Sequence, residues 1–331
     1  MRALLSLTGC LVALLMPALI HAQGADDYPS RPVTIVIANA AGGASDNDIR
    51  IWMARLAENL GQQFVLEYKP GAGQTIAMSF LARQKPDGHY IGIFSANMPL
   101  IRLRYPDAGL DPVNGFEQIS VLHRRDGLLA VHASVPIANI KEYVAYARAK
   151  PGVLNFSTSG HASIDHISGA WLMSATHTVG AMSFIHYKTS VSAHADLISG
   201  RVHMTSIPYG ITGPFVTLVK TGKLRNIGTT SAQRSNMAPD VPTLQEQGVA
   251  DYDLPSFNGL MAPPNTPAAI INKLYGAIVT VSRLPQFQQQ LGESNVIVAG
   301  TPAEARRLIF TQEDRYRKLG QELSIDYREN Y

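Results

Sequence analysis

Short runs rich in β-branched residues alternate with amphipathic stretches along most of the chain. The first run, residues 33–39 (VTIVIAN), has the composition of a buried strand, and residues 46–60 place apolar side chains at helical spacing. This alternation of strands and helices predicts an α/β fold with parallel sheets. The first such unit has its strands at 33–39, 64–69 and 90–96 and its helices at 46–60 and 75–84.

A second unit of the same kind follows a connection rich in Pro, Gly and Asp at residues 105–115. Its expected helices are 140–149, 164–175 and 192–198; its strands are 116–122, 128–132, 154–159, 182–187 and 202–207, with closing segments at 215–220 and 224–229. A strand at 254–262 then precedes two or three C-terminal helices, and the pattern does not decide which unit those helices cover. Two units that each open with a strand, a Gly-rich or hydroxyl-rich turn and a helix predict two similar lobes that face each other.

The first 22 residues differ from the rest of the chain. A positive start at Arg2 and an apolar run at 3–20 are followed by polar residues after Ala22, which is typical of a secretory signal peptide cleaved near that residue. Two alternatives stay open: an uncleaved N-terminal anchor, and lipidation at Cys10, because residues 7–10 (LTGC) mimic a lipoprotein cleavage box. The expected destination is a bacterial periplasm.

Composition narrows the class of protein. A length of 331 residues favours two domains, and 46% hydrophobic with 16% charged residues excludes a largely disordered chain. The net charge of +3 is dispersed, so we expect no nucleic-acid partner. No run of about 20 apolar residues follows residue 22, so we expect no membrane span in the body of the chain. Because the single cysteine, Cys10, lies in the expected signal peptide, thiol catalysis, disulfides and cysteine-metal sites are excluded from the mature protein.

The turn at residues 39–46 (NAAGGASD) is the strongest candidate site. It joins a strand to a helix, and the candidate ligand residues in it are Asn39, Gly43, Ala44, Ser45 and Asp46. The glycines allow the backbone to approach a ligand, and the free N–H groups and dipole of the following helix favour an anion. An ordinary capped turn is the alternative, and the P-loop pattern occurs nowhere in the chain.

A second turn of this kind spans residues 157–166 (STSGHASIDH). Its candidate ligand residues are Ser159, His161, Ser163, Asp165 and His166. The hydroxyls and backbone donors are suited to a second carboxylate by the same physics. The two histidines lack a Cys or Glu partner nearby and no H-E-x-x-H occurs, so we expect no metal; a serine hydrolase is disfavoured because no G-x-S-x-G occurs.

Lys188, Ser190 and Tyr209 complete the candidates obtained from the residues themselves. Lys188 and Ser190 follow the strand at 182–187 and offer a cation and a hydroxyl, with a solvated lysine as the alternative; Tyr209 ends the run at 202–209 and is placed to lay a ring over the cleft.

Three further features are interpreted as structural. Residues 70–76 (PGAGQTI) resemble a dinucleotide-binding turn, but Ile76 stands at the third glycine position, so a tight turn is favoured. Trp52 and Trp171 lie inside expected helices and are assigned to the core.

Motifs in a fixed order along some 300 residues resemble the Bug (Bordetella uptake gene) or TctC-like receptors of tripartite tricarboxylate transporters. The motifs are Tyr28-Pro29-Ser30-Arg31-Pro32, Gly42-Gly43 with Ser45-Asp46, Pro70-Gly71-Ala72-Gly73, Pro86-Asp87-Gly88, Ala149-Lys150-Pro151-Gly152, Tyr187-Lys188, Gly222-Lys223-Leu224-Arg225 and Pro239-Asp240-Val241-Pro242-Thr243. The resemblance implies a two-lobed Venus-flytrap fold of the type II-like periplasmic binding proteins. It also implies that the ligand loops are 39–46, Ser95 to Asn97, 159–166 and 188–190.

The chain departs from the family pattern at four places. Ala41 and Ala44 flank the glycine pair, Ala162 and Thr189 replace usual glycines, and Asp165 stands where a small residue is common. Each added Cβ narrows or re-aims a ligand loop.

Together these features predict a periplasmic solute-binding protein, not an enzyme, with no cofactor. The expected domains are a signal peptide at 1–22, lobe 1 at 23–125 plus 254–331, and lobe 2 at 126–253. We expect a monomer that binds a small organic carboxylate (a di- or tricarboxylate, an amino acid or an aromatic acid such as terephthalate) and delivers it to the membrane subunits of a tripartite tricarboxylate transporter. A periplasmic receptor of the same fold that signals to a sensor kinase is the alternative.

Overall fold

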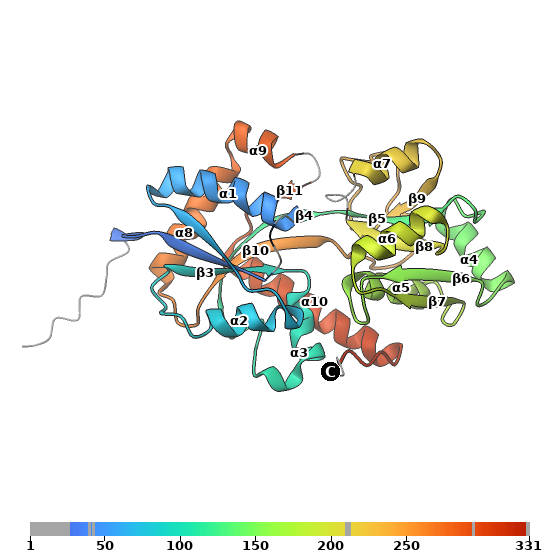
Figure 1. The fold of residues 1–331 in the computed structure, drawn as a ribbon, viewed down its shortest axis with the longest axis horizontal. Coiled ribbons are helices and arrows are strands. Elements are labelled where there is room, and N and C mark those ends of the chain that lie inside the picture. The colour runs from blue at the N-terminus through green and yellow to red at the C-terminus, as the bar shows by residue number, and fades with distance from the viewer. Residues whose placement is uncertain (1–26, 39–40, 42–43, 209–212, 293–294, 329–331) are drawn as a thin grey trace, which may run out of the picture.

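The chain forms two lobes that lie side by side, each built on one sheet with helices against it (Figure 1). This arrangement is that of a computed structural model, which describes residues 27–38, 41, 44–208, 213–292 and 295–328. Within these residues, no helix combines the length and apolar character needed to cross a membrane.

Lobe 1 holds a six-stranded sheet. Its strands are β1 (Val33–Ile37), β2 (Phe64–Tyr68), β3 (Tyr90–Ser95), β4 (Glu117–Arg125), β10 (Ser256–Ala262) and β11 (Val296–Ile297). Its helices are α1 (Ala44–Leu60), α2 (Thr75–Leu81), α3 (Ile101–Arg104), α8 (Ala268–Ser282), α9 (Pro285–Leu291) and α10 (Pro302–Glu322), with short 3-10 turns at Ala72–Gln74, Met98–Leu100 and Pro106–Ala108.

Lobe 2 holds a five-stranded sheet. Its strands are β5 (Gly127–His132), β6 (Leu154–Thr158), β7 (Met182–His186), β8 (Met204–Pro208) and β9 (Leu224–Thr229). Its helices are α4 (Ile140–Ala149), α5 (Ile164–Ala175), α6 (Ser190–Ser199) and α7 (Gly213–Lys220). The bounds predicted for α4 and α5 are confirmed, whereas α6 begins two residues earlier than expected because Thr189 caps it by accepting a hydrogen bond from the Ser192 N–H at 3.2 Å.

Both sheets are mixed, because each contains parallel and antiparallel pairs of strands. The orders are β11-β4-β10-β3-β1-β2 and β7-β6-β8-β5-β9. Strands β1–β3 and β6–β8 run parallel within their sheets, whereas β10 is antiparallel to β3 and β4, and β5 is antiparallel to β8 and β9. The prediction of parallel sheets was therefore wrong for the strands that enter each lobe from the other one, since these approach from the opposite direction.

The lobes are joined by two adjacent chain crossings. The first runs from β4 through Asp126 into β5, and the second leads from β9 through Leu254 into β10. The crossings are hydrogen-bonded to each other: the Thr230 N–H donates to the Gly127 carbonyl, and the Leu254 N–H donates to the Thr230 carbonyl, both at 2.8 Å. Two short crossings of this kind form a hinge.

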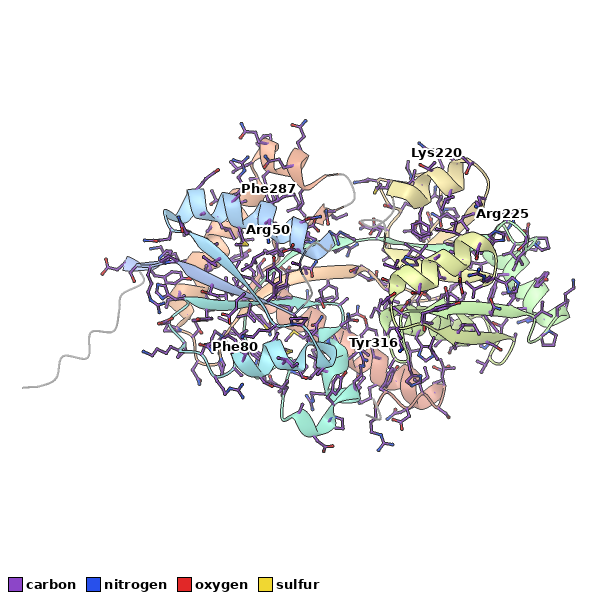
Figure 2. All side chains as sticks on the ribbon, viewed as in Figure 1. Arg50, Phe80, Lys220, Arg225, Phe287 and Tyr316 are labelled. Carbon is purple, nitrogen blue, oxygen red and sulfur yellow. The ribbon has the colours of Figure 1, made fainter. Side chains whose placement is uncertain are left out.

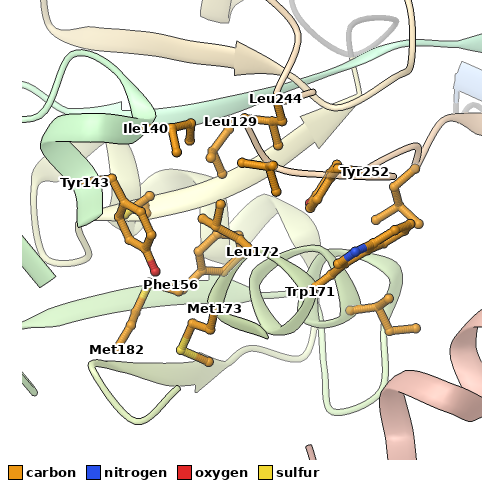
Figure 3. Packing of buried hydrophobic residues seen from close by; sticks show 14 of the residues in the cluster. Leu129, Ile140, Tyr143, Phe156, Trp171, Leu172, Met173, Met182, Leu244 and Tyr252 are labelled. Carbon is orange, nitrogen blue, oxygen red and sulfur yellow. The ribbon is translucent and has the colours of Figure 1, made fainter. Parts of the chain in front are cut away.

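Each lobe has its own apolar core. In lobe 1, Trp52 is 1% exposed and packs edge-on against Phe287 of α9. In lobe 2, Trp171 and Leu172 of α5 pack with Tyr143 and Tyr252 (Figure 3). The assignment of both tryptophans to the core is confirmed.

The C-terminal helices cover different surfaces, which the sequence pattern left undecided. Helix α8 contacts α1 and β4 in lobe 1, whereas α10 contacts β4 at one end and α5 of lobe 2 at the other. Tyr316, on the second half of α10, is fully buried in the lobe 2 cluster, and the Arg315 guanidinium lies 4.7 Å from the centre of the Trp171 ring (Figure 2). Helix α10 therefore bridges the two lobes.

Candidate functional site

A pocket of about 120 Å³ lies where lobe 2 meets the hinge. It is lined by residues from the ends of strands and the starts of helices: Gly127, Ser159, Ile164, Asp165, Ser190, His194, Ser206, Thr230, Leu254 and Ser256. Ligands of open α/β sheets bind at this position, outside the carboxyl ends of the strands where successive helices diverge. Three of the predicted site residues, Ser159, Asp165 and Ser190, are brought together here.

Helices α5 and α6 both begin at this pocket. Ser163 caps α5, its Oγ accepting from the His166 N–H at 3.4 Å and donating to the Gly160 carbonyl at 2.6 Å. Thr189 caps α6, and Ser190 is the first residue of that helix. The N-termini of two helices direct partial positive charge and free N–H groups toward one volume, which favours an anion there.

The carboxylate of Asp165 lies in the pocket and occupies donors of the β6–α5 loop. One oxygen accepts from the Ser159 N–H at 2.6 Å, and the other accepts from the Ser159 hydroxyl at 3.0 Å. These are donors that a ligand carboxylate would otherwise use. The chain therefore carries its own negative charge at the N-terminus of α5.

His194 faces the same pocket from α6. Burial lowers its pKa, and the nearby charge of Asp165 opposes that shift without cancelling it. Its imidazole is therefore neutral at pH 7. Among the lining residues that the structure describes, Asp165 thus carries the one formal charge.

In lobe 1, Asp46 lies in the first turn of α1 and is 2% exposed. It accepts hydrogen bonds from the Tyr68 hydroxyl at 2.6 Å and from Arg50 Nε at 3.3 Å. Arg50 lies one turn further along α1, and its side chain is exposed (Figure 2). These contacts fix the start of α1 rather than leave Asp46 open to a ligand.

Several predicted site residues lie outside the region that the structure describes. Asn39, Gly43 and Tyr209 fall in the gaps of the described chain, and for Ala44 and Ser45 the description covers their place at the start of α1 and not their side chains. Their role in binding stays a prediction.

Ser95, Asn97 and Lys188 do not line the pocket in this structure. The Ser95 hydroxyl accepts from Gln74 Nε2 at 2.7 Å, and the side chains of Asn97 and Lys188 are exposed. The two histidines of the second loop lie elsewhere as well: His161 and His166 line a different pocket together with His186.

Seven lining residues were not among the predicted site residues: Gly127, Ile164, His194, Ser206, Thr230, Leu254 and Ser256. His194 follows Ser190 by four residues on α6, so helical spacing from one candidate would have found it. Thr230 and Ser256 flank the hinge crossings, and no local signal marks such positions before the strand order is known.

Comparison with known proteins decides the family. The profile of the TctC family, described as the tripartite tricarboxylate transporter family receptor, matches residues 49–325. The chain belongs to this family. A relative in Bordetella bronchiseptica, a UPF0065 protein, is 31% identical over 327 residues, which cover 97% of this chain and 94% of the relative.

Solved structures of the TctC family show the same fold. The periplasmic binding protein BugD superposes with a TM-score of 0.74 at 26% identity, over 91% of this chain and 100% of BugD. The R. palustris protein Rpa4515, solved with adipate, superposes with a TM-score of 0.77 at 28% identity, over 92% of this chain and 100% of that protein. The predicted two-lobed fold is thereby confirmed, and the chain is a TctC-family periplasmic solute-binding receptor, not an enzyme.

Proposed function

We propose that this receptor binds a small organic carboxylate in the pocket between its lobes and delivers it to the membrane subunits of a tripartite tricarboxylate transporter. The observation that carries the proposal is the convergence of α5 and α6, whose N-termini meet at one pocket lined with hydroxyl groups. Hydrogen bonds from N–H and hydroxyl groups to a carboxylate contribute about 1.5–3 kcal/mol each, so recognition does not require an arginine.

The residue boundaries that we propose for the two lobes lie at the hinge. We propose lobe 1 at 23–125 plus 254–331 and lobe 2 at 126–253, since β4 ends at Arg125 and β10 begins at Ser256. We also propose that the protein acts as a monomer in the periplasm after removal of a signal peptide that ends near Ala22.

Asp165 narrows the class of carboxylate. The start of α6, with Ser190, is free to take one carboxylate, whereas the start of α5 already holds the carboxylate of Asp165. A second ligand carboxylate at the start of α5 would lie against that of Asp165, and the two would repel each other strongly because little water screens them. We therefore propose a ligand with a carboxylate at one end and a hydrogen-bond donor, such as a hydroxyl, amide or ammonium group, at the other.

A matched panel of ligands tests this function. Mature protein (residues 23–331) is screened by thermal shift with diacids, their monoamides, hydroxy acids, amino acids, and neutral diamides of the same lengths, and the hits are measured by calorimetry. A ligand at about a hundred times its Kd stabilises the folded state by about 2.7 kcal/mol. We expect stabilisation by acids that carry a donor and none by diamides. If no member containing a carboxylate bound, the proposed function would be wrong.

A further inference from the structure

A second pocket, of about 260 Å³, lies on lobe 2 beneath the segment that follows α10. Three histidines line it with Phe184 and Met173, and Asp326 of the C-terminal segment closes one side. This pocket shares no lining residue with the pocket at the hinge. The solute-binding function makes no use of it.

The three histidines converge from separate elements. His161 belongs to the β6–α5 loop, His166 to the first turn of α5, and His186 ends β7. One ring nitrogen from each lies within 4.8 Å of the others, and the three ring centres are 4.9–5.4 Å apart. Three imidazoles so close together, beside apolar side chains, form a donor set of the kind that binds transition metals.

Hydrogen bonds outside the cluster fix two of the rings in the state needed for a ligand. His161 Nε2 lies 2.6 Å from the Asp326 carbonyl oxygen, which only accepts, so Nε2 carries the proton and Nδ1 keeps its lone pair. His186 Nδ1 lies 2.6 Å from the Thr158 hydroxyl oxygen, whose own proton goes to the Gly160 carbonyl. His186 Nδ1 therefore donates, and its Nε2 lone pair is available. Partners of this kind orient ligating histidines in known metal sites.

His166 differs from the other two. Its Nδ1 accepts from the Ala162 N–H at 3.0 Å, so its proton resides on Nε2 in the protein without metal. To ligate a metal through Nδ1, this ring must lose the hydrogen bond from the Ala162 N–H. His161 and His186 are exposed, so they can move the short distance required to reach metal–nitrogen bonds of about 2.0–2.1 Å.

We propose that His161, His186 and His166 form a binding site for a divalent transition metal ion of the Zn²⁺ or Co²⁺ class, with His161 and His186 as the pre-oriented ligands. The site lies beside the loop that carries Ser159, and His161 also holds the C-terminal segment through Asp326. A bound metal would therefore clamp this loop to the chain end that follows α10.

The test uses tag-free mature protein stripped of metal with a chelator. Co²⁺ is titrated and followed by its visible absorption, and Zn²⁺ bound per chain is measured by equilibrium dialysis. We expect one equivalent of metal, displacement of Co²⁺ by Zn²⁺, and absorption typical of nitrogen ligation. His161→Asn and His186→Asn should each weaken binding at least about tenfold.

His177→Asn is the matched control, because His177 is exposed, lies outside the cluster and has a backbone φ of 53° that asparagine tolerates. It should bind metal like the parent. Because all three substituted residues are exposed, circular dichroism is expected to report unchanged folding in every variant. Binding of much less than one equivalent by the parent, or equal affinity in the parent and in both cluster variants, would overturn the proposal. Neither result bears on carboxylate binding, which is measured separately.

Discussion

Asp165 places a carboxylate in the pocket at the start of α5. Ser159 donates hydrogen bonds to both oxygens of the Asp165 carboxylate, so the side chain is fixed at the start of α5 rather than free to turn into solvent. A fixed charge in a pocket acts mainly on specificity, because it excludes like-charged partners more strongly than it attracts neutral ones.

The charge of Asp165 can be removed with little change of shape. In Asp165→Asn, the amide keeps an acceptor for the Ser159 N–H and a group that can pair with the Ser159 hydroxyl. We expect the preference for a monoamide over its parent diacid, measured by calorimetry, to fall at least about tenfold, or ~1.4 kcal/mol. An unchanged preference would show that Asp165 does not face the ligand.

Ser190 tests the other end of the pocket. Ser190→Asp keeps a residue suited to the first turn of a helix but adds a negative charge beside the expected ligand carboxylate. We expect carboxylate affinity to fall at least about a hundredfold, or ~2.7 kcal/mol, with an unchanged melting temperature of the protein without ligand. Ala303→Asp adds the same charge to the first turn of α10, at a residue that does not line the pocket, and should bind normally. Normal binding by Ser190→Asp would show that the ligand carboxylate does not bind at the start of α6.

A buried charge network supports the lobe 1 side of the hinge. Asp48 forms an ion pair with Arg125, the last residue of β4, and lies 3.2 Å from Nε2 of His123. Trp52 donates to the other ring nitrogen of His123, and burial lowers the pKa of His123 to about 3, so that ring is neutral. Burial also lowers the pKa of Arg125 to about 10, which leaves the guanidinium charged at neutral pH.

Asp48→Asn should therefore remove the negative charge with which Asp48 pairs the buried Arg125 guanidinium. We expect a loss of about 3–5 kcal/mol in the free energy of unfolding, measured with urea. Asp314→Asn, which removes a partly exposed carboxylate paired with Arg317 and Lys318, should change stability little. Equal effects of the two substitutions would contradict the structural role given to Asp48.

Two of the loops predicted from the sequence, 159–166 and 188–190, contribute residues to the candidate pocket, but the sequence did not predict which side chains within them share a face. Asp165 and His166 are neighbours in the chain, yet successive helical residues point about 100° apart. Asp165 therefore lines the hinge pocket, whereas His166 joins His186 on another surface of lobe 2. His186 was missed because it comes from a different strand, and a cluster assembled across elements leaves no spacing motif in the sequence.

At the scale of elements, periodicity predicted the helices and strands closely. Helices α4 and α5 have the predicted bounds because each has a side-chain cap, Asn139 and Ser163. Strand direction was not predictable in the same way. The antiparallel direction of β5 and β10 follows from the crossings between lobes, which no local pattern records.

Two glycines in different elements test how tightly those elements are packed. An added Cβ at Gly276, on the exposed face of α8, meets nothing within 4 Å, so Gly276→Ala should stabilise the protein by about 0.5–1 kcal/mol. An added Cβ at Gly259, in the crossing strand β10, would press against the Phe94 ring and lie 2.5 Å from the Ser120 carbonyl oxygen. Gly259→Ala should cost about 1–3 kcal/mol. Urea denaturation measures both, and stabilisation by Gly259→Ala would contradict the packing at this crossing.

At the scale of the whole molecule, two lobes with separate cores are joined by a short hinge and bridged by α10. The hinge allows the lobes to rotate, whereas the contact of α10 with α5 limits the directions in which they do so. A ligand that touches both lobes favours the closed arrangement by the difference between its affinities for the two states. We propose that closure around the ligand links the pocket to delivery.

Small-angle X-ray scattering tests directly whether a carboxylate binds between the lobes and closes them. The radius of gyration of the mature protein is measured without ligand and with a saturating carboxylate identified by calorimetry. Ser190→Asp, at a ligand concentration that saturates the parent but not the variant, serves as the control. We expect a smaller radius of gyration for the parent with ligand and no change for the variant. A parent that binds the ligand in the calorimeter with an unchanged radius of gyration would contradict this expectation.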